Sequence, residues 1–434
     1  MKNKSKKIWA KAKKLIPTGN HLLSKHPDIF LPNKWPEYYK KAKGIYIWDQ
    51  NNKKYIDMCL MGVGTNILGY ANDNIDKEVI KSIKNSNMSS LNNVNEYYLA
   101  KELIKLHPWF DMAKFARTGA EANSIAIRIS RAYTGKENVA VCGYHGWHDW
   151  YLAANYNNKS LDSHLFPNLK SKGVVKILKK NIFSFEYNNF NQLEKLIKTK
   201  NIGTIFMEVS RTYKPKNNFL KKIRKIANQK KIVLIFDECS SGFRECNGGL
   251  HKKFGIYPDM AMFGKALGNG YAITSILGRK KIMKAAESTF ISSTFWTEGI
   301  GFVAGKATLN EFKRVKPWKK INKIGNYIKK KWIELAKKNN IEIEVFGLDA
   351  MPGFKFKYKE NNLYKSFITQ EFLKKNILAS NSIYVSSNHN LKVVKKYLTI
   401  LDKIFSQINY YRKEKKPKKL LDGPEAMMGM TRLN

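Results

Sequence analysis

The sequence has few cysteines, few arginines and no long apolar run. Its four cysteines, Cys59, Cys142, Cys239 and Cys246, form no C-x-x-C pair in a chain of 434 residues, which excludes a disulfide scaffold and predicts reduced thiols in a cytoplasmic protein. No stretch reaches about 18 consecutive apolar residues, so we expect no membrane-spanning helix. The basic N-terminus, residues 1–17, lacks both an arginine and a long apolar segment. A secretory signal or a mitochondrial presequence is therefore not expected.

Acidic residues are also scarce. Thirty-four Asp and Glu face 79 Lys and Arg, which gives a net charge of +45, and such a charge is typical of nucleic-acid-binding proteins. However, 69 of the basic residues are Lys and only 10 are Arg, and they are spread along the chain together with 42 Asn. Arg reads phosphates and bases with a planar fork, whereas Lys is a solvated point charge. We interpret the excess as compositional drift on solvated faces and keep nucleic-acid binding as a distant alternative.

The composition is that of a globular protein with more than one core. Hydrophobic residues make up 43% of the chain, and its length favours one large domain with a smaller one. Helical spacing of apolar residues predicts helices near 8–16 and 318–339, and period-two runs predict a hairpin of 44–49 with 54–57 and strands near 341–346 and 353–357. The predicted organisation is an N-terminal segment 1–55 that packs with the small domain, a large α/β domain 56–310, a small α+β domain 311–411 and a basic mobile tail 412–434.

Between about 110 and 280, short apolar runs alternate with helical stretches. This pattern is typical of βαβ units and a mostly parallel sheet. The runs do not alternate apolar with polar residues, which indicates that helices cover both faces of the sheet. The predicted buried strands are 139–142, 202–208, 232–237, 260–263 and 273–277.

Polar residues stand at the ends of several of these strands, where open parallel sheets bind their ligands. Asp237 ends the run 232–236 and is either a functional carboxylate or a cap of the next segment. Gly119-Ala120-Glu121 opens a helix that ends before Gly135, and the backbone N–H groups of such a start can hold a phosphate. His145 and His148 have no second cluster at ligand spacing, so no metal site is expected.

Lys265 follows the apolar strand 260–263 and has only apolar neighbours along the chain. Burial lowers the pKa of a lysine amine, which suits an amine that forms an imine. Ala266 stands where a Walker motif needs Ser or Thr, so a nucleotide-binding loop is not indicated. Pyridoxal phosphate uses a lysine, an acid opposite its pyridine nitrogen, a helix start for its phosphate and a flat side chain over its ring. Tyr144, after the strand 139–142, could supply the flat side chain.

With these motifs in place, the sequence resembles the class III pyridoxal-phosphate aminotransferases over roughly residues 10–410. The resemblance is greatest to the branch that contains glutamate-1-semialdehyde 2,1-aminomutase. The matching motifs are Arg117-Thr118-Gly119-Ala120-Glu121-Ala122, Tyr144-His145-Gly146, Phe236-Asp237-Glu238-Cys239-Ser240-Ser241-Gly242-Phe243-Arg244 and Phe263-Gly264-Lys265-Ala266-Leu267-Gly268.

The resemblance implies a homodimer of fold type I, the aspartate aminotransferase-like fold, with active sites shared between subunits and pyridoxal 5'-phosphate as cofactor. It also implies catalytic roles for Lys265, as the Schiff-base lysine, and for Asp237, as the partner of the pyridine nitrogen. The remaining cofactor contacts that it implies are Thr118, Gly119 and Ala120 at the phosphate, Tyr144 on one ring face, Cys239 (often Val in the family) on the other face, Glu208 near the ring hydroxyl, and Thr294 from the neighbouring subunit.

Two departures from the aminomutase bear on the substrate. In the aminomutase, an Arg of the N-terminal segment holds the substrate carboxylate. The N-terminal segment of this sequence contains no Arg, because the first Arg in the chain is Arg117. The run 295–299 is aromatic rather than small, and Trp147, Trp150 and Tyr151 add bulk. We expect transfer of an amino group from an amino-acid donor to a carbonyl acceptor such as a sugar aldehyde or ketone. The aminomutase reaction is the alternative, and the aromatics could equally be interface core.

The charge interpretation predicts weak, sequence-independent binding to duplex DNA, because solvated lysines contact only phosphates. Fluorescence anisotropy with two duplexes of unrelated sequence should give equal affinities that fall steeply as salt rises. Tight binding of one duplex over the other at physiological salt would restore the nucleic-acid interpretation.

Overall fold

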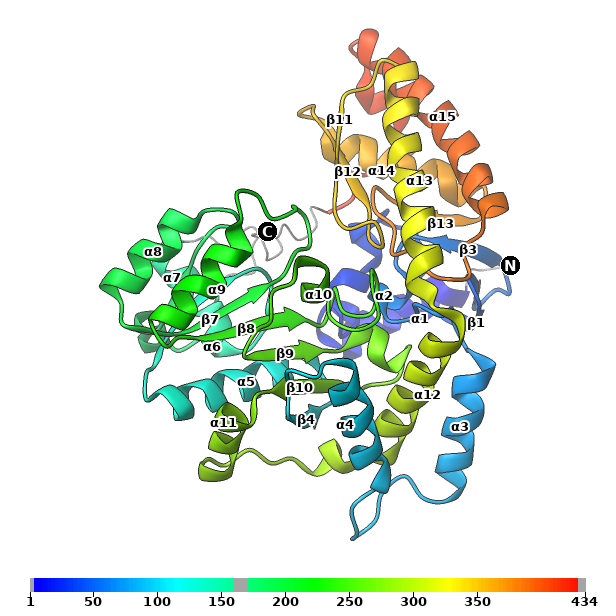
Figure 1. The fold of residues 1–434 in the computed structure, drawn as a ribbon. Coiled ribbons are helices and arrows are strands. Elements are labelled where there is room, and N and C mark those ends of the chain that lie inside the picture. Colours follow the sequence, from blue (N-terminus) through cyan, green and yellow to red (C-terminus); the bar gives the residue numbers. More distant parts are fainter. Residues whose placement is uncertain (1–3, 159–170, 428–434) are drawn as a thin grey trace. The chain divides into compact units, whose positions relative to one another are not determined.

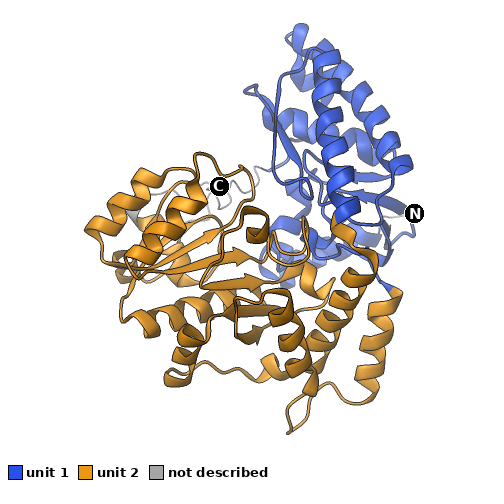
Figure 2. Ribbon diagram, viewed as in Figure 1, with its two compact units in different colours: residues 1–72, 319–429 blue, residues 73–318, 430–434 orange. Residues whose placement is uncertain are grey.

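The computed structural model describes residues 4–158 and 171–427. The chain divides into two compact units, which we call unit 1 (residues 1–72 and 319–429) and unit 2 (residues 73–318 and 430–434) (Figure 2). The sequence suggested boundaries near 55 and 310. Unit 2 extends to 318 because α12 (Gly299–Val315) packs against α3 (Asp73–Lys84) and α4 (Val94–Leu106). None of the helices in the described ranges combines the length and the apolar character that a membrane crossing requires.

Unit 2 is built on a seven-stranded sheet with the order β4-β10-β9-β8-β7-β5-β6 (Figure 1). All neighbours from β9 to β6 are parallel, and β10 is antiparallel to both β9 and β4, so the prediction of a mostly parallel sheet is confirmed. The strands are β4 (Met112–Ala116), β5 (Asn138–Cys142), β6 (Ile182–Ser184), β7 (Ile202–Glu208), β8 (Val233–Glu238), β9 (Met260–Phe263) and β10 (Thr274–Gly278). The predicted bounds of β7 and β9 are correct, and those of β5, β8 and β10 lie within one residue.

Helices cover both faces of this sheet, as the unbroken apolar strands predicted. In Figure 1, α8 and α9 lie on one face and α5 on the other. The helices of unit 2 besides α3, α4 and α12 are α5 (Gly119–Thr134), α6 (Asp149–Leu152), α7 (Asn155–Asn158), α8 (Phe190–Thr199), α9 (Phe219–Gln229), α10 (His251–Phe254) and α11 (Lys280–Met283).

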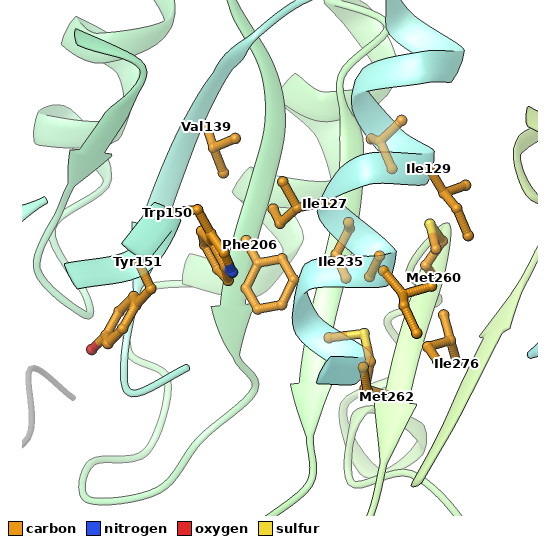
Figure 3. Close-up of a cluster of buried hydrophobic side chains, with 14 of the residues drawn as sticks. Ile127, Ile129, Val139, Trp150, Tyr151, Phe206, Ile235, Met260, Met262 and Ile276 are labelled. Carbon is orange, nitrogen blue, oxygen red and sulfur yellow. The ribbon is translucent and has the colours of Figure 1, made fainter. Parts of the chain in front are cut away.

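The core under α5 fixes this helix against the strand ends. Ile125, Ile127 and Ile129 of α5 pack on Phe206 and Ile235 of the central strands (Figure 3). Burial of a large apolar side chain contributes roughly 1.5–3 kcal/mol, so the register between α5 and the sheet is strongly held. The first turn of α5 is therefore presented at one edge of the sheet.

Unit 1 carries a four-stranded sheet of order β1-β2-β3-β13, in which β13 is parallel to β3. Its strands are β1 (Tyr39–Lys43), β2 (Tyr46–Asp49), β3 (Lys54–Met58) and β13 (Ile377–Ala379), and β11 (Ile343–Phe346) forms a separate hairpin with β12 (Gly353–Phe356). The helices are α1 (Lys4–Leu15), α2 (Met61–Gly64), α13 (Pro317–Lys338), α14 (Asn361–Lys374) and α15 (Leu391–Lys413). The β2–β3 hairpin confirms the sequence prediction, which missed β1.

Residues 412–427 of the predicted mobile tail lie within the described ranges. After α15, the chain to residue 427 packs on α14 of the same unit. Gln370 Nε2 donates to the Leu420 carbonyl at 3.1 Å, and the Ala426 amide donates to Ser366 Oγ at 2.9 Å. Leu420 and Ala426 are both buried. Two apolar anchors in a basic segment thus outweigh its charge, and residues 428–434 lie outside the described ranges.

A buried histidine of unit 2 makes the stability of the fold depend on pH. His107 Nδ1 donates to the Leu103 carbonyl at 2.8 Å, and Nε2 accepts from the Gly249 amide at 3.0 Å, so the ring must be neutral. Burial lowers the pKa of His107 to about 4, although the bond to Leu103 opposes this shift. The folded pKa therefore lies below that of the unfolded chain.

We predict that the free energy of unfolding falls as the pH falls from about 6.5 towards 4, because the unfolded chain binds a proton that the native ring excludes. The contribution of His107 is up to about 3 kcal/mol. Urea unfolding between pH 7.5 and 4.5 checks it against His107→Gln, whose amide can make both bonds but does not titrate. Equal pH slopes for both proteins would contradict this assignment.

Candidate active site

Four predicted residues lie at the same edge of the sheet of unit 2. Glu208 and Asp237 are register partners at the carboxyl ends of β7 and β8. Tyr144 lies two residues after β5, and Lys265 two residues after β9. Because these strands are parallel neighbours, their carboxyl ends meet at one edge of the sheet, where the backbones of these four residues lie.

Asp237 is a buried carboxylate with three hydrogen bonds. Its Oδ2 accepts from Asn123 Nδ2 at 2.9 Å and faces His145 Nδ1 at 3.0 Å, and its Oδ1 accepts from the Cys239 amide at 3.0 Å. Burial alone would raise the pKa of Asp237, but the hydrogen bond and charge of His145 and the other donors hold it below its usual value. The carboxylate stays ionised and can balance a positive charge in front of the strand end.

His145 connects this carboxylate to the preceding strand. Its Nε2 lies 3.1 Å from the Cys142 carbonyl, and its Nδ1 faces Asp237. Both ring nitrogens thus lie within hydrogen-bond distance of an oxygen atom. The pair is enclosed by protein, and T-shaped contacts with Tyr151 and Phe206 fix the ring plane.

Lys265 opens a short 3₁₀ helix, Lys265–Gly268, with a strained backbone. Its φ of 39° is in the left-handed region, where residues other than glycine are rare. The side chain is half-buried, and Nζ donates to Ser240 Oγ at 2.6 Å. The strained turn aims the amine towards the segment that follows Asp237.

The first turn of α5 offers two unused backbone donors. Thr118 caps the helix in a reciprocal box with Glu121, whose carboxylate accepts from the Thr118 amide at 2.7 Å. Within the described ranges, we find no hydrogen-bond acceptor for the amides of Gly119 and Ala120. Free N–H groups and the positive end of the helix dipole fit a phosphate.

Glycines bring the neighbouring segments close to this helix start. A Cβ on Gly119 would lie 3.4 Å from Cys239 Sγ, and one on Gly264 would lie 3.4 Å from the same sulfur. A Cβ on Gly146 would lie 2.7 Å from the Ala120 Cβ. The helix start, the Asp237 segment and the Lys265 turn therefore converge around the Cys239 side chain.

Cys239 serves as a packing surface within this convergence. Burial, with the charge of Asp237, raises the pKa of its thiol well above the usual value, so the sulfur stays protonated and is a weak nucleophile. On the other side, the Tyr144 amide donates to Glu208 Oε2 at 3.2 Å. This bond fixes the backbone that carries the Tyr144 ring.

Thr294 lies on a separate, exposed segment, the 3₁₀ helix Thr294–Thr297. Arg117 holds this segment by donating to the carbonyls of Phe295 at 2.8 Å, Trp296 at 3.1 Å and Glu298 at 2.6 Å. Trp296 Nε1 donates to Glu121 Oε1 at 3.1 Å. Within the described chain we see no contact of the Thr294 side chain with the other predicted site residues, and its role towards a second subunit stays a prediction.

The structure also divides the aromatic residues that follow Tyr144. Trp150 and Tyr151 are buried in the core of unit 2, where they donate to Ser124 Oγ and to the Gly143 carbonyl (Figure 3). Trp147, in contrast, is 68% exposed. Only Trp147 of these three is therefore available at the surface.

Sequence reasoning missed three residues of the site. Asn123 lies four residues into α5, on the face that meets the sheet, and His145 stands inside the motif that begins with Tyr144. Ser240 follows Asp237 by three positions. Helical spacing from Gly119 could have indicated Asn123, whereas the contact of Ser240 with Lys265 depends on the turn geometry.

Comparison with known proteins defines the class. The family model Aminotransferase class-III matches residues 32–402, so the chain belongs to the class III aminotransferases. It is a pyridoxal-phosphate-dependent enzyme of fold type I. The donor set described above fits this cofactor: an ionised Asp237, the Lys265 amine and the free amides of Gly119 and Ala120. When bound, pyridoxal phosphate takes up the electrons that a substrate carbon releases with its proton.

Among individual proteins, the chain is 32% identical to the 3-aminobutyryl-CoA aminotransferase of Cloacimonas acidaminovorans, over 89% of this chain and 91% of that protein. It is 30% identical to the glutamate-1-semialdehyde 2,1-aminomutase of Methanocaldococcus jannaschii, over 93% of this chain and 98% of the relative. The FumI protein of Sphingopyxis sp. MTA144 has a similar structure, with a TM-score of 0.84, 22% identity and coverage of 96% and 99% of the two chains.

Replacement of Asp237 by Asn tests the role of the buried charge. A neutral amide cannot hold a positive pyridine nitrogen, so the rate of the donor half-reaction should fall roughly 10²-fold or more. The cofactor Kd should rise much less, because the amides of Gly119 and Ala120 are unchanged. Stopped-flow spectroscopy gives the rate, and equilibrium dialysis gives the Kd. An active Asn variant would make Asp237 a structural cap.

Proposed function

We propose that this aminotransferase is a homodimer that moves an amino group from an amino-acid donor to a carbonyl acceptor without a carboxylate, such as a sugar aldehyde or ketone. The observation that supports this class of acceptor is the distribution of arginines. The proposal of amino-group transfer rests on the convergence of Lys265, Asp237 and the start of α5.

Each of these residues has a defined task in the proposed reaction. The Lys265 amine would take the proton from the substrate carbon as a base and would later give this proton up as an acid. Asp237, with His145 behind it, holds the positive charge of the pyridine nitrogen. The amides of Gly119 and Ala120 bind the phosphate and so fix the distance from the ring to Lys265.

Two of the arginines near the site are engaged with the protein backbone. Arg117 binds three carbonyls of the 295–298 segment, and the buried Arg244 donates to the Ser240 carbonyl at 2.5 Å. In the described part of unit 1, Arg412 is the single arginine, and it bonds to the Asn340 carbonyl and Asn409. Because Arg is the residue that binds carboxylates with two parallel bonds, this distribution favours an acceptor without a carboxylate.

Exposed aromatic side chains support a hydroxylated, partly apolar acceptor. Trp147 and Phe295 are about two-thirds exposed, at 68% and 67%, and Trp296 is half-buried. Flat aromatic rings of this kind offer a surface on which sugar-like rings can pack.

Exposed apolar residues of unit 2 support the homodimer. Leu91, Phe290 and Phe295 are 83%, 81% and 67% exposed, and Tyr97 is exposed on α4. A second copy that covered these side chains would remove apolar surface from water, which favours association. Phe295 follows Thr294 directly, so a second copy bound there would cover the segment that the family resemblance assigns to the neighbouring cofactor.

A second function is favoured by the relatives. Several proteins that the chain resembles at about 30% identity are named glutamate-1-semialdehyde 2,1-aminomutase, including those of Methanocaldococcus jannaschii and Nitrosopumilus maritimus. Such a reaction would move the amine within one substrate that bears a carboxylate. Arg211 is the first arginine after β7, and it lies three residues beyond Glu208.

We predict that Trp296→Ala slows the acceptor half-reaction about tenfold and the donor half-reaction by less than about twofold, because a bulky acceptor needs the aromatic surface and a small donor does not. Single-turnover kinetics of each half-reaction, with sugar aldehydes and ketones as acceptors, measures the two effects. Trp296→Phe is the matched control. It keeps a ring and loses only the bond to Glu121, so it should retain most of the acceptor rate.

Two outcomes would contradict the proposal. If Trp296→Phe is as slow as Trp296→Ala, the bond to Glu121 rather than the aromatic surface sets the rate. If the wild type isomerises glutamate 1-semialdehyde efficiently and Arg211→Lys removes this activity, the aminomutase is the correct function.

A further inference from the structure

A serine outside the predicted site contacts the reactive lysine directly. Lys265 Nζ donates to Ser240 Oγ at 2.6 Å, just below the usual lower limit of about 2.7 Å for an N–H···O bond. Ser240 is only 6% exposed. A buried hydroxyl at this distance fixes one position for an amine that otherwise turns about four single bonds.

The backbone of Ser240 is itself held in place from both sides. Upstream, the Cys239 amide donates to Asp237 Oδ1 at 3.0 Å. Downstream, Arg244 Nε donates to the Ser240 carbonyl at 2.5 Å, and the Gly242 amide donates to the Glu238 carbonyl at 2.9 Å. The hydroxyl is therefore presented by a rigid turn and not by a mobile loop.

Glu238 anchors the remainder of this turn beneath the site. Its side chain accepts from Ser241 Oγ at 3.1 Å and from the His251 amide at 3.1 Å, and it also binds the Leu250 amide and His251 Nδ1. Burial would raise the pKa of Glu238, but the charge and bonds of His251 keep it below its usual value. An ionised carboxylate with four donors makes displacement of the Ser240 turn costly.

From this geometry we propose that Ser240 is a positioning residue for Lys265. It holds the amine, whenever the amine is not bonded to the cofactor, at the point from which Lys265 moves the substrate proton. No proton passes to the serine. Oγ accepts a bond from one Nζ hydrogen, while the lone pair of the neutral amine takes the proton from the substrate carbon. This inference rests on the amino-transfer part of the proposed function and is independent of the acceptor.

The test is the donor half-reaction of the holoenzyme, followed with an amino acid that carries hydrogen or deuterium at its α-carbon. Ser240→Ala should slow the reaction on the order of tenfold, the value of one ordinary hydrogen bond. The deuterium isotope effect should rise, because a misplaced amine makes proton transfer more rate-limiting. Cofactor Kd should change by less than about twofold, since the phosphate donors are untouched.

Two further variants of Ser240 separate positioning from folding. Ser240→Thr keeps the hydroxyl and should restore most of the rate. Ser240→Cys keeps the size of the side chain with a weaker acceptor, and should give an intermediate rate. Both remain informative if the alanine variant does not fold.

Ser275→Ala is the matched control in the same unit. Ser275 on β10 is fully buried, and its Oγ has no hydrogen-bond partner among the described residues. Its removal should leave both the rate and the isotope effect unchanged.

The inference is overturned if Ser240→Ala keeps the wild-type rate and isotope effect. It is also overturned if the lower rate of the variant is explained entirely by weaker cofactor binding. The proposed function fails in a different way, by absence of any donor half-reaction in the wild type.

Discussion

Two adjacent carboxylates, Asp237 and Glu238, are buried together at the end of β8, and the site is organised around the need to keep both ionised. Successive side chains of a strand point to opposite faces of the sheet, so each acid requires its own donors. Asp237 obtains them from Asn123 and His145, which ties α5 and the Tyr144 segment to the strand. Glu238 obtains them from Ser241 and the 250–251 backbone, which closes the turn that follows.

This constraint explains why residues of the candidate site alternate with residues that only hold the turn in place. Breaking one partner of a buried charge costs far more than a surface ion pair contributes. The segment from Asp237 to Arg244 is therefore rigid because its charges must be satisfied. The same rigidity presents the Ser240 hydroxyl and the Cys239 side chain to the Lys265 turn.

Much of unit 2 was predictable because its signals are local. Unbroken apolar runs marked β7 and β9 at their correct bounds, and Gly135, with a φ of 64°, ends α5 as its position suggested. The partners of Asp237 were not predictable in this way. Asn123 and His145 lie 114 and 92 residues from it in the sequence, and no spacing rule links such distant residues. The packed segment up to residue 427 was missed because its two apolar anchors are diluted by lysines.

The hydrogen bonds between the start of α5 and the 295–298 segment limit how the sequence of this enzyme can change in evolution. The Glu121 carboxylate accepts hydrogen bonds from the Thr118 amide at the helix cap and from the Trp296 indole. Arg117 donates hydrogen bonds to three carbonyls of the 295–298 segment. A change at one of these positions leaves donors or acceptors of the other segment without their partners. In related lineages, the residues at 117, 121 and 296 should therefore covary as one evolutionary unit, and new substrate preferences at 296 should arise together with changes at the helix cap.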